Sequence, residues 1–219
     1  MITIILPIHN GLEGTKKTIQ SIFDTVKDVD YEILIIESES IDGTKEYIEQ
    51  LKENYPELIR IMWGKKEGLP KAMNIGITNS TGDVLITQND IIFNKYDFDW
   101  LEMMEKATKE ENIGLACPIN AFSSSSGYDN SPWVGTWCMY IPRKTINKIG
   151  LFDEEFSPGC GDDIDYSYRV MKAGMNLVVL PFMVNHNRDA VEHFNDWEEL
   201  KQKHLEYFYK KYNLKFKKK

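Results

Sequence analysis

The sequence of 219 residues predicts an α/β fold with a mostly parallel central sheet flanked by helices, and two observations support this prediction. Short apolar runs alternate with amphipathic segments through the first 90 residues, which is typical of βαβ units. The composition, with 42% hydrophobic and 27% charged residues, is that of a globular chain able to bury one sizeable core.

The first half of the chain contains four predicted strands and three predicted helices. The run ITIILPI at 2–8 is continuously apolar, which is typical of a parallel strand buried on both faces. Pro70 fits the start of a helix, because proline is tolerated in the first helical turn. The other predicted strands are 31–38, 58–63 and 82–87, and the helical segments are 15–26, 42–55 and 68–80.

The second half is less regular. A polar loop rich in glycine and serine is predicted at 120–132, and a loop of this length in a compact domain is either functional or disordered. A strand containing three aromatic residues follows it at 133–142. The other predicted elements are a helix at 98–110, a strand at 113–117, a helix starting at 162, an apolar segment at 176–187 and an amphipathic helix at 194–212.

Charge and cysteine content exclude several classes of protein. The net charge is −8, and six lysines lie in the last ten residues, so the rest of the chain is strongly acidic. An acidic body argues against binding to nucleic acid. The basic tail predicts either a solvated, frayed terminus or weak contact with an anionic membrane surface. Cys117, Cys138 and Cys160 lack metal-type spacing and are expected to be reduced thiols, which favours the cytoplasm.

Polar residues interrupt the apolar runs where the predicted strands end. Ligand sites of parallel sheets lie at the carboxyl ends of the strands. Gln88, Asn89 and Asp90 follow the fourth strand, and a carboxylate at such a position is suited to Mg²⁺ or Mn²⁺. A strand-to-loop turn built on Asn–Asp chemistry is the alternative.

Three aspartates crowd the start of the helix at 162. Asp165 and Arg169 are four residues apart and are expected to pair on one helical face. Asp162 and Asp163 have no such partner in the helix, and their mutual repulsion raises one pKa. This favours a general base at the pair, while helix capping by the same carboxylates is the alternative.

Four stretches of the chain, in order and covering roughly residues 1–190, resemble the family 2 glycosyltransferases. IILPIHN resembles the opening strand of that family, and YEILIIESESIDGT resembles its second strand. KEGLPKAMNIGITNSTGDVLITQND resembles the run that ends in Asp-x-Asp, and the stretch GTWCMYIPRKTINKIGLFDEEFSPGCGDDIDYSYRVMKAG resembles the later Phe-Asp-Glu and Glu-Asp segment.

The resemblance implies a GT-A fold, Rossmann-like, in one domain over 1–219. The expected parts are a nucleotide-sugar half (1–90), an acceptor and catalytic half (91–190), and a C-terminal helix with a basic tail (191–219). It also implies an inverting enzyme that moves a sugar from a nucleotide donor, a UDP-sugar first, to a glycan. A short chain of this kind suggests the cytoplasm of a bacterium or of a virus-infected host.

The resemblance assigns roles to individual residues. Asp163 matches the aspartate that takes the acceptor proton, and Asp162 is the second candidate. Asp90 is the expected ligand for Mn²⁺ or Mg²⁺, and His186 matches a histidine that completes the metal shell. The residues expected to bind the donor are Pro7, His9, Glu37, Gly68, Lys71 and Asn89.

The chain departs from the family pattern at several of these positions. His9 replaces a tyrosine, Glu37 begins Glu-Ser-Glu in place of Asp-Asp-Gly, and Asp90 is the one carboxylate left of Asp-x-Asp. Trp133 and Trp137 are candidates either for stacking on an acceptor sugar or for core packing. A catalytically silent nucleotide-sugar or glycan-binding module is therefore kept as an alternative, with a nucleotidyltransferase behind it.

Overall fold

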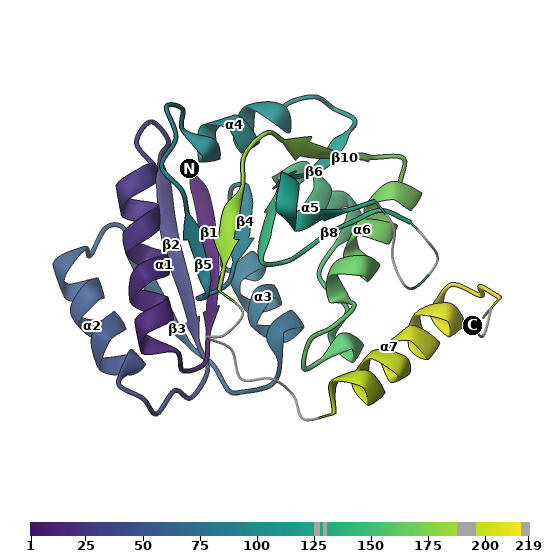
Figure 1. The fold of residues 1–219 in the computed structure, drawn as a ribbon, viewed down its shortest axis with the longest axis horizontal. Coiled ribbons are helices and arrows are strands. Elements are labelled where there is room, and N and C mark those ends of the chain that lie inside the picture. The colour runs from purple at the N-terminus through teal and green to yellow at the C-terminus, as the bar shows by residue number, and fades with distance from the viewer. Residues whose placement is uncertain (125–127, 129–130, 188–195, 216–219) are drawn as a thin grey trace.

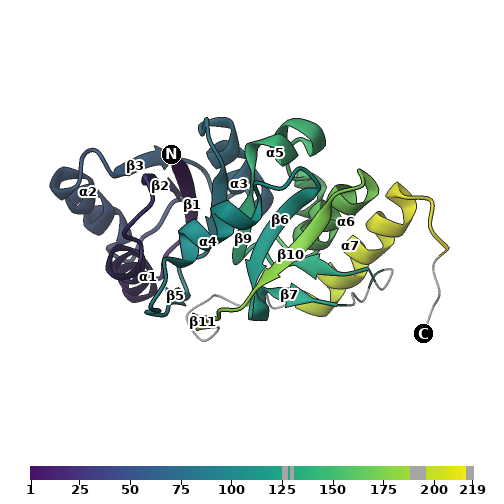
Figure 2. The same ribbon diagram turned by 90° about the horizontal axis from the view of Figure 1, so that it is seen from above.

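The computed structural model describes all residues except 125–127, 129–130, 188–195 and 216–219 (Figure 1). Its main sheet has seven strands in the order β10-β6-β9-β4-β1-β2-β3. In Figures 1 and 2, α1 and α2 lie at one end of the molecule, and α6 and α7 lie at the other. None of the described helices is both long and apolar enough to cross a bilayer.

The first half forms the parallel part of the sheet as predicted. β1 pairs in parallel with both β2 and β4, and β2 pairs in parallel with β3. Every residue of β1 is buried except the partly buried Pro7, in agreement with the continuous apolar run. The elements are β1 (Ile2–Ile8), α1 (Leu12–Thr25), β2 (Tyr31–Glu37), α2 (Thr44–Asn54), β3 (Ile59–Trp63), α3 (Leu69–Thr78) and β4 (Val84–Thr87).

The second half extends the sheet through one reversed strand. β9 is antiparallel to both β4 and β6, so it joins the two halves, and β10 then pairs in parallel with β6. The elements are β5 (Ile91–Phe93), α4 (Trp100–Ala107), β6 (Ile113–Pro118), η1 (Ile119–Ala121), β7 (Phe122–Ser123), β8 (Trp133–Val134), β9 (Cys138–Ile141), α5 (Arg143–Ile149), η2 (Glu154–Phe156), α6 (Asp162–Lys172), β10 (Asn176–Leu180), β11 (Val184–His186) and α7 (Trp197–Lys211).

The prediction of one continuous strand over 133–142 is wrong. The chain forms β8, turns, and then forms β9 in a different sheet. The indole of Trp137 folds back over Gly135, where a Cβ would collide with it, and the N–H of Gly135 donates to the carbonyl of Ala121 at 2.8 Å. Glycine at this position therefore allows the turn.

The expectation of a solvated, frayed C-terminus is wrong for the described part of the tail. Phe208 is completely buried in an aromatic cluster with Tyr128, Phe156 and Tyr168. Tyr212 packs on Phe208 with ring centroids 4.9 Å apart. The apolar face predicted for this helix is confirmed at Phe208, whereas Trp197 is 44% exposed and Phe194 lies outside the described residues.

Candidate active site

Two loops at the carboxyl ends of β1 and β2 are tied together by hydrogen bonds. His9 Nδ1 lies 2.5 Å from the carbonyl oxygen of Ser38. The backbone N–H of Asn10 donates to Ser40 Oγ at 2.8 Å, and Asn10 Oδ1 accepts from the N–H of Ile41 at 2.9 Å. Asn10 takes a left-handed conformation with φ of 58°, which asparagine tolerates better than most residues. These hydrogen bonds fix the two loops relative to each other at the sheet edge where the sequence predicts donor binding.

Glu37 organises one of these loops. Its side chain is 1% exposed, and its carboxylate accepts hydrogen bonds from the N–H groups of Ser40 at 2.6 Å and Glu39 at 3.1 Å. The carboxylate therefore faces the backbone of residues 39–40. Any contribution of Glu37 to donor binding acts through the shape of this loop in the arrangement described.

Asn89 links the end of β4 to the start of α1. Its Nδ2 donates to the carbonyl oxygen of Asn10 at 2.8 Å and lies 3.1 Å from Thr15 Oγ1. The middle residue of the Gln88-Asn89-Asp90 stretch therefore has a structural role at the same sheet edge. The neighbouring carboxylate of Asp90 is available as a ligand for a cation.

The buried Asp90 pairs with the partly buried His186. β11 pairs antiparallel with β5 and puts His186 opposite Ile91, next to Asp90 in the chain. His186 Nε2 lies 3.1 Å from Asp90 Oδ2. Neither carboxylate oxygen of Asp90, nor Nδ1 of His186, has a hydrogen-bond partner among the described residues, although all three atoms are buried. Two buried carboxylate oxygens without a hydrogen-bond partner, with an imidazole nitrogen 3.1 Å from one of them, fit the ligand chemistry of Mn²⁺ or Mg²⁺.

The pair supplies only part of a metal shell. Within the described ranges no three or more His, Cys, Asp or Glu side chains converge on one point. A cation held by Asp90 and His186 would keep open positions, which is the usual state of a metal that also binds substrate phosphates.

Gly68 and Lys71 begin α3 on the donor side. A Cβ at Gly68 would lie 2.8 Å from Ser157 Oγ and 2.9 Å from Pro158 Cα, and the φ of Gly68 is +103°. The backbone approach that glycine permits here is therefore with the segment 157–158, whose Pro158 carbonyl accepts the N–H of Leu69 at 2.8 Å. Lys71 Nζ pairs with Glu67 Oε1 at 2.6 Å at the surface.

Gly68→Ala is expected to lower the free energy of unfolding by about 1–3 kcal/mol, because a side chain is both strained at this φ and overpacked against the loop. Chemical denaturation of the variant and the wild type measures the difference. Gly174→Ala is the matched control, since Gly174 also has a positive φ of 78° but open space around its Cβ position. Equal losses in both variants would mean that contact between α3 and 157–158 adds nothing.

The acid pair lies at the first turn of α6. Asp162 is 3% exposed, and Thr136 Oγ1 donates to its carboxylate at 3.4 Å. Burial raises the pKa of Asp162 to about 6. Asp163 is partly buried, and burial together with the charge of Asp162 raises the pKa of its carboxyl well above the usual value. The pair thus holds its protons to higher pH than ordinary carboxyls, as a general base near neutral pH requires.

The turn between β8 and β9 connects the two sites. Thr136 contacts Asp162, and the ring of the next residue, Trp137, lies 4.7 Å from the ring of His186. The metal-type pair and the acid pair are therefore separated by one short turn. Trp137 also packs against the main core, whereas Trp133 lies in β8 opposite Ser123. Thr136 had no signal in the sequence, because its role depends on this turn.

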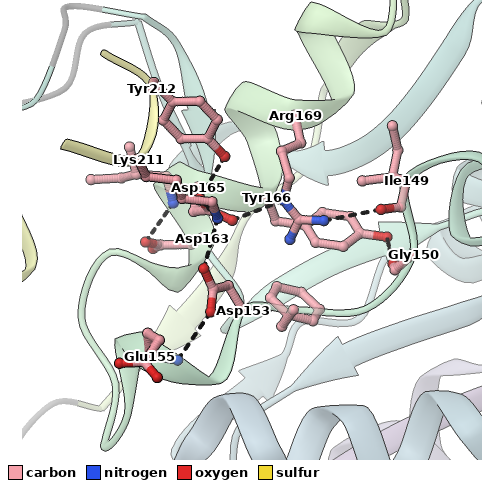
Figure 3. A network of polar contacts seen from close by, with 12 residues as sticks. Ile149, Gly150, Asp153, Glu155, Asp163, Asp165, Tyr166, Arg169, Lys211 and Tyr212 are labelled. Atoms are coloured by element: carbon pink, nitrogen blue, oxygen red, sulfur yellow. Dashed lines mark hydrogen bonds and ion pairs between the residues drawn. The ribbon is translucent and has the colours of Figure 1, made fainter. Parts of the chain in front are cut away.

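Asp165 is confirmed as the partner of Arg169. Arg169 Nε donates to Asp165 Oδ2 at 2.8 Å. Lys211 Nζ and Tyr212 Oη, both from the C-terminal segment, also donate to Asp165 at 2.5 and 2.7 Å (Figure 3). These two partners lie 46 and 47 residues away in sequence, so no local pattern predicts them.

Comparison with solved structures shows the class of fold. The chain aligns over its whole length with 65% of the mannosyltransferase PcManGT of Pyrobaculum calidifontis in complex with GDP-Man and Mn²⁺, at a TM-score of 0.74 and 19% identity. It aligns over 83% of its length with 42% of GalNAc-T7 with UDP, GalNAc and Mn²⁺, at a TM-score of 0.71 and 15% identity. The fold is the GT-A fold of glycosyltransferases, as predicted.

Sequence comparison gives the family. The sequence profile of the family described as "Glycosyl transferase family 2" matches residues 3–160. The chain belongs to that family, which confirms the predicted class of enzyme. A Methanococcus voltae enzyme, dolichyl N-acetyl-alpha-D-glucosaminyl phosphate 3-beta-D-2,3-diacetamido-2,3-dideoxy-beta-D-glucuronosyltransferase, is 26% identical over 88% of this chain and 69% of its own length. Polypeptide N-acetylgalactosaminyltransferase 11 of Xenopus tropicalis is 21% identical over 83% of this chain, which spans 37% of that protein.

Proposed function

We propose that the protein is an inverting glycosyltransferase that moves a sugar from a nucleotide-diphosphate donor to a hydroxyl group of a glycan or glycoconjugate. The observation that carries the proposal is the turn at 135–137, which contacts Asp162 of the acid pair through Thr136 and His186 of the Asp90–His186 pair through Trp137. A transferase of this kind needs a cation site for a diphosphate beside a base for an acceptor.

The metal site of the proposal consists of Asp90 and His186, with Mn²⁺ or Mg²⁺ as the ion. A divalent ion held there would neutralise negative charge on the departing diphosphate. Lys71, at the surface of α3, and the loop shaped by Glu37 are the proposed donor contacts, with Pro7 and His9 beside them at the end of β1. Gly68 supports them by letting α3 approach the segment 157–158.

The chemical step balances with the groups of this chain. The acceptor O–H bond breaks and its proton goes to a carboxylate oxygen of Asp163. The acceptor oxygen forms a bond to the anomeric carbon from the face opposite the leaving group. The bond from that carbon to the diphosphate oxygen breaks, and the diphosphate leaves with the electron pair. Asp162, held by Thr136, keeps a second carboxyl beside the base.

The donor nucleotide and the acceptor are the finer part of the proposal. The two structural neighbours were solved with GDP-Man and with UDP and GalNAc, which supports testing both nucleotides, UDP first. The Methanococcus voltae relative is named for transfer to a dolichyl-linked sugar phosphate, which supports a glycoconjugate acceptor. Membrane contact in the cytoplasm would use the lysines beyond Lys211, because Lys211 itself is bound in the fold.

One observation favours the second candidate, a silent nucleotide-sugar-binding module. Gln88 stands where the family pattern has its first aspartate, and the side chain of Asn89 is bound to the backbone of Asn10 and to Thr15, so the cation would rest on one carboxylate. A weakened metal site lowers catalysis more than it lowers recognition of the nucleoside. A transferase is favoured because Asp162 and Asp163 are both present beside the site.

UDP or GDP is expected to raise the melting temperature strongly with Mn²⁺ and weakly with EDTA. At 100-fold excess over Kd, linkage stabilises the folded state by about 2.7 kcal/mol. Thermal shift measures this effect, and Asp90→Ala should remove more of it than His186→Ala, because a hard cation prefers the charged oxygen ligand. Equal shifts with Mn²⁺ and with EDTA would contradict the metal site. Nucleotide binding without transfer to any acceptor would favour the binding module.

A further inference from the structure

The carboxylate of Asp165 is the centre of a buried charge cluster between α6 and α7. Its side chain is not exposed to solvent, and it accepts hydrogen bonds from Arg169, Lys211 and Tyr212 (Figure 3). Lys211 also donates to Asp153 at 2.8 Å. The cluster therefore balances two carboxylates with two cations, and Lys211 is the member that touches both carboxylates.

The cluster begins one helical turn from the acid pair. Asp165 follows Asp162 by three residues on α6, so the two side chains are neighbours on the helix surface. Burial is the main cause of the raised pKa of Asp162, and the charge of Asp165 raises it further. A cation on Asp165 opposes that effect, and Lys211 supplies it from a different element at 2.5 Å.

The loop that leads into the acid pair is also held by α7. Asp153 accepts the N–H of Glu155 at 3.1 Å and the hydroxyl of Tyr207 at 2.8 Å, in addition to its bond with Lys211. Near the other end of the loop, His204 Nδ1 lies 2.7 Å from the carbonyl oxygen of Cys160. The segment from 153 to 161 is therefore fixed by side chains of α7 immediately before Asp162.

We propose that Lys211 is a positioning residue for the Asp162–Asp163 pair, acting through Asp165 on the helix and through Asp153 on the preceding loop. The inference rests on the proposed role of Asp163 as the base. It assigns to the C-terminal helix a part in catalysis, although no residue of α7 is assigned to donor, metal or acceptor.

Among the residues that the structure describes, the titratable groups around the pair other than Asp165 and Lys201 carry no charge near neutral pH. Burial raises the pKa of the Cys160 thiol to about 11 and raises the pKa of Tyr128 still further. Burial lowers the pKa of His204, which keeps the imidazole neutral. The charge of Lys201 in α7 lowers the pKa of Cys160 and so opposes the effect of burial on that thiol. Thr136, from the turn before β9, is uncharged. A substitution in the group formed by Asp165, Arg169 and Lys211 therefore changes the net charge next to the acid pair.

Lys211→Met tests the proposal, since methionine keeps an unbranched side chain and removes the charge. The midpoint of the Asp162–Asp163 titration, followed by ¹³C NMR of the aspartate carboxyl carbons, should move upward by about 0.5 pH unit or more. The acid limb of the pH profile for sugar transfer should move with it. Lys211→Arg should restore both values, and the exposed neighbour Lys210 provides the matched control, Lys210→Met.

A double variant keeps the test valid if Lys211→Met folds poorly. Adding Asp165→Asn to Lys211→Met removes both members of the pair, so the titration midpoint should return toward the wild-type value. A fall in melting temperature with an unchanged midpoint in Lys211→Met, or a midpoint in the double variant that stays as high as in a shifted Lys211→Met, would overturn the proposal. If Lys211→Met shifts the midpoint but the wild-type protein transfers no sugar, the proposed function is overturned and the positioning role stays supported.

Discussion

Asp163→Asn is expected to lower the turnover of sugar transfer by about 10²–10⁴-fold, or roughly 3–5 kcal/mol of barrier. Asparagine keeps the volume of the side chain and its bond with the N–H of Ile164, but it cannot accept the acceptor proton. Nucleotide binding should remain, because Asp163 is not among the proposed donor or metal contacts. Transfer assays and nucleotide titration on the same protein separate the two effects.

Asp162→Asn is the control for that variant and should cost less turnover. Near-normal transfer by Asp163→Asn would mean that the acidic turn is a helix cap and that the base lies elsewhere.

The substitution Asp162→Asn is expected to stabilise the folded protein, although it lowers turnover. Burial raises the pKa of Asp162 from 3.8 to about 6, so the folded state takes up a proton in this window and stability falls as pH rises through it. Asp162→Asn should therefore raise the melting temperature at pH 8 relative to the wild type.

Asp165→Ala is expected to cost about 3 kcal/mol of unfolding free energy, or roughly 6–12 °C in melting temperature. The change removes the common partner of Arg169 and Lys211 and leaves both cations at a largely buried site. The side chains of these two residues are 20% and 22% exposed, which places the loss at the lower end of the range for broken buried pairs. Calorimetry at neutral pH measures the effect.

An exposed aspartate provides the control for the loss at Asp165. Asp97→Ala should change the free energy of unfolding by no more than about 0.5 kcal/mol, as is usual for surface substitutions. If Asp165→Ala behaved like Asp97→Ala, the contacts between α6 and α7 would contribute nothing to folding. Proteolysis of the variant should then also leave α7 as resistant as in the wild type.

The parts of the fold that the sequence predicts are those set by local patterns. The apolar run at 2–8 determines a buried strand whatever its neighbours are. The spacing of Asp165 and Arg169 on one helix is likewise enough to predict their ion pair. The single strand expected at 133–142 fails because the turn depends on the packing of Trp137 over Gly135, which no periodicity carries.

The candidate site follows the same division. His186 comes next to Asp90 only because β11 pairs with β5, so the family resemblance predicted a contact that spacing alone could not. The resemblance also predicted that Glu37 binds the donor. In the structure its carboxylate accepts hydrogen bonds from backbone N–H groups of the loop that follows. The bonds of Lys211 with Asp153 and Asp165 join α7 to distant parts of the chain and had no signal in the sequence.

The reversed strand β9 also sets the order in which the sheet can be completed during synthesis. β4 is made by residue 87, but the strand that covers its open side is Cys138–Ile141, more than fifty residues later. β6 leaves the ribosome earlier than β9 and joins the sheet only through it. Until β9 arrives, the growing chain exposes an unpaired edge of Val84–Thr87, and such edges are where nascent proteins aggregate or recruit chaperones.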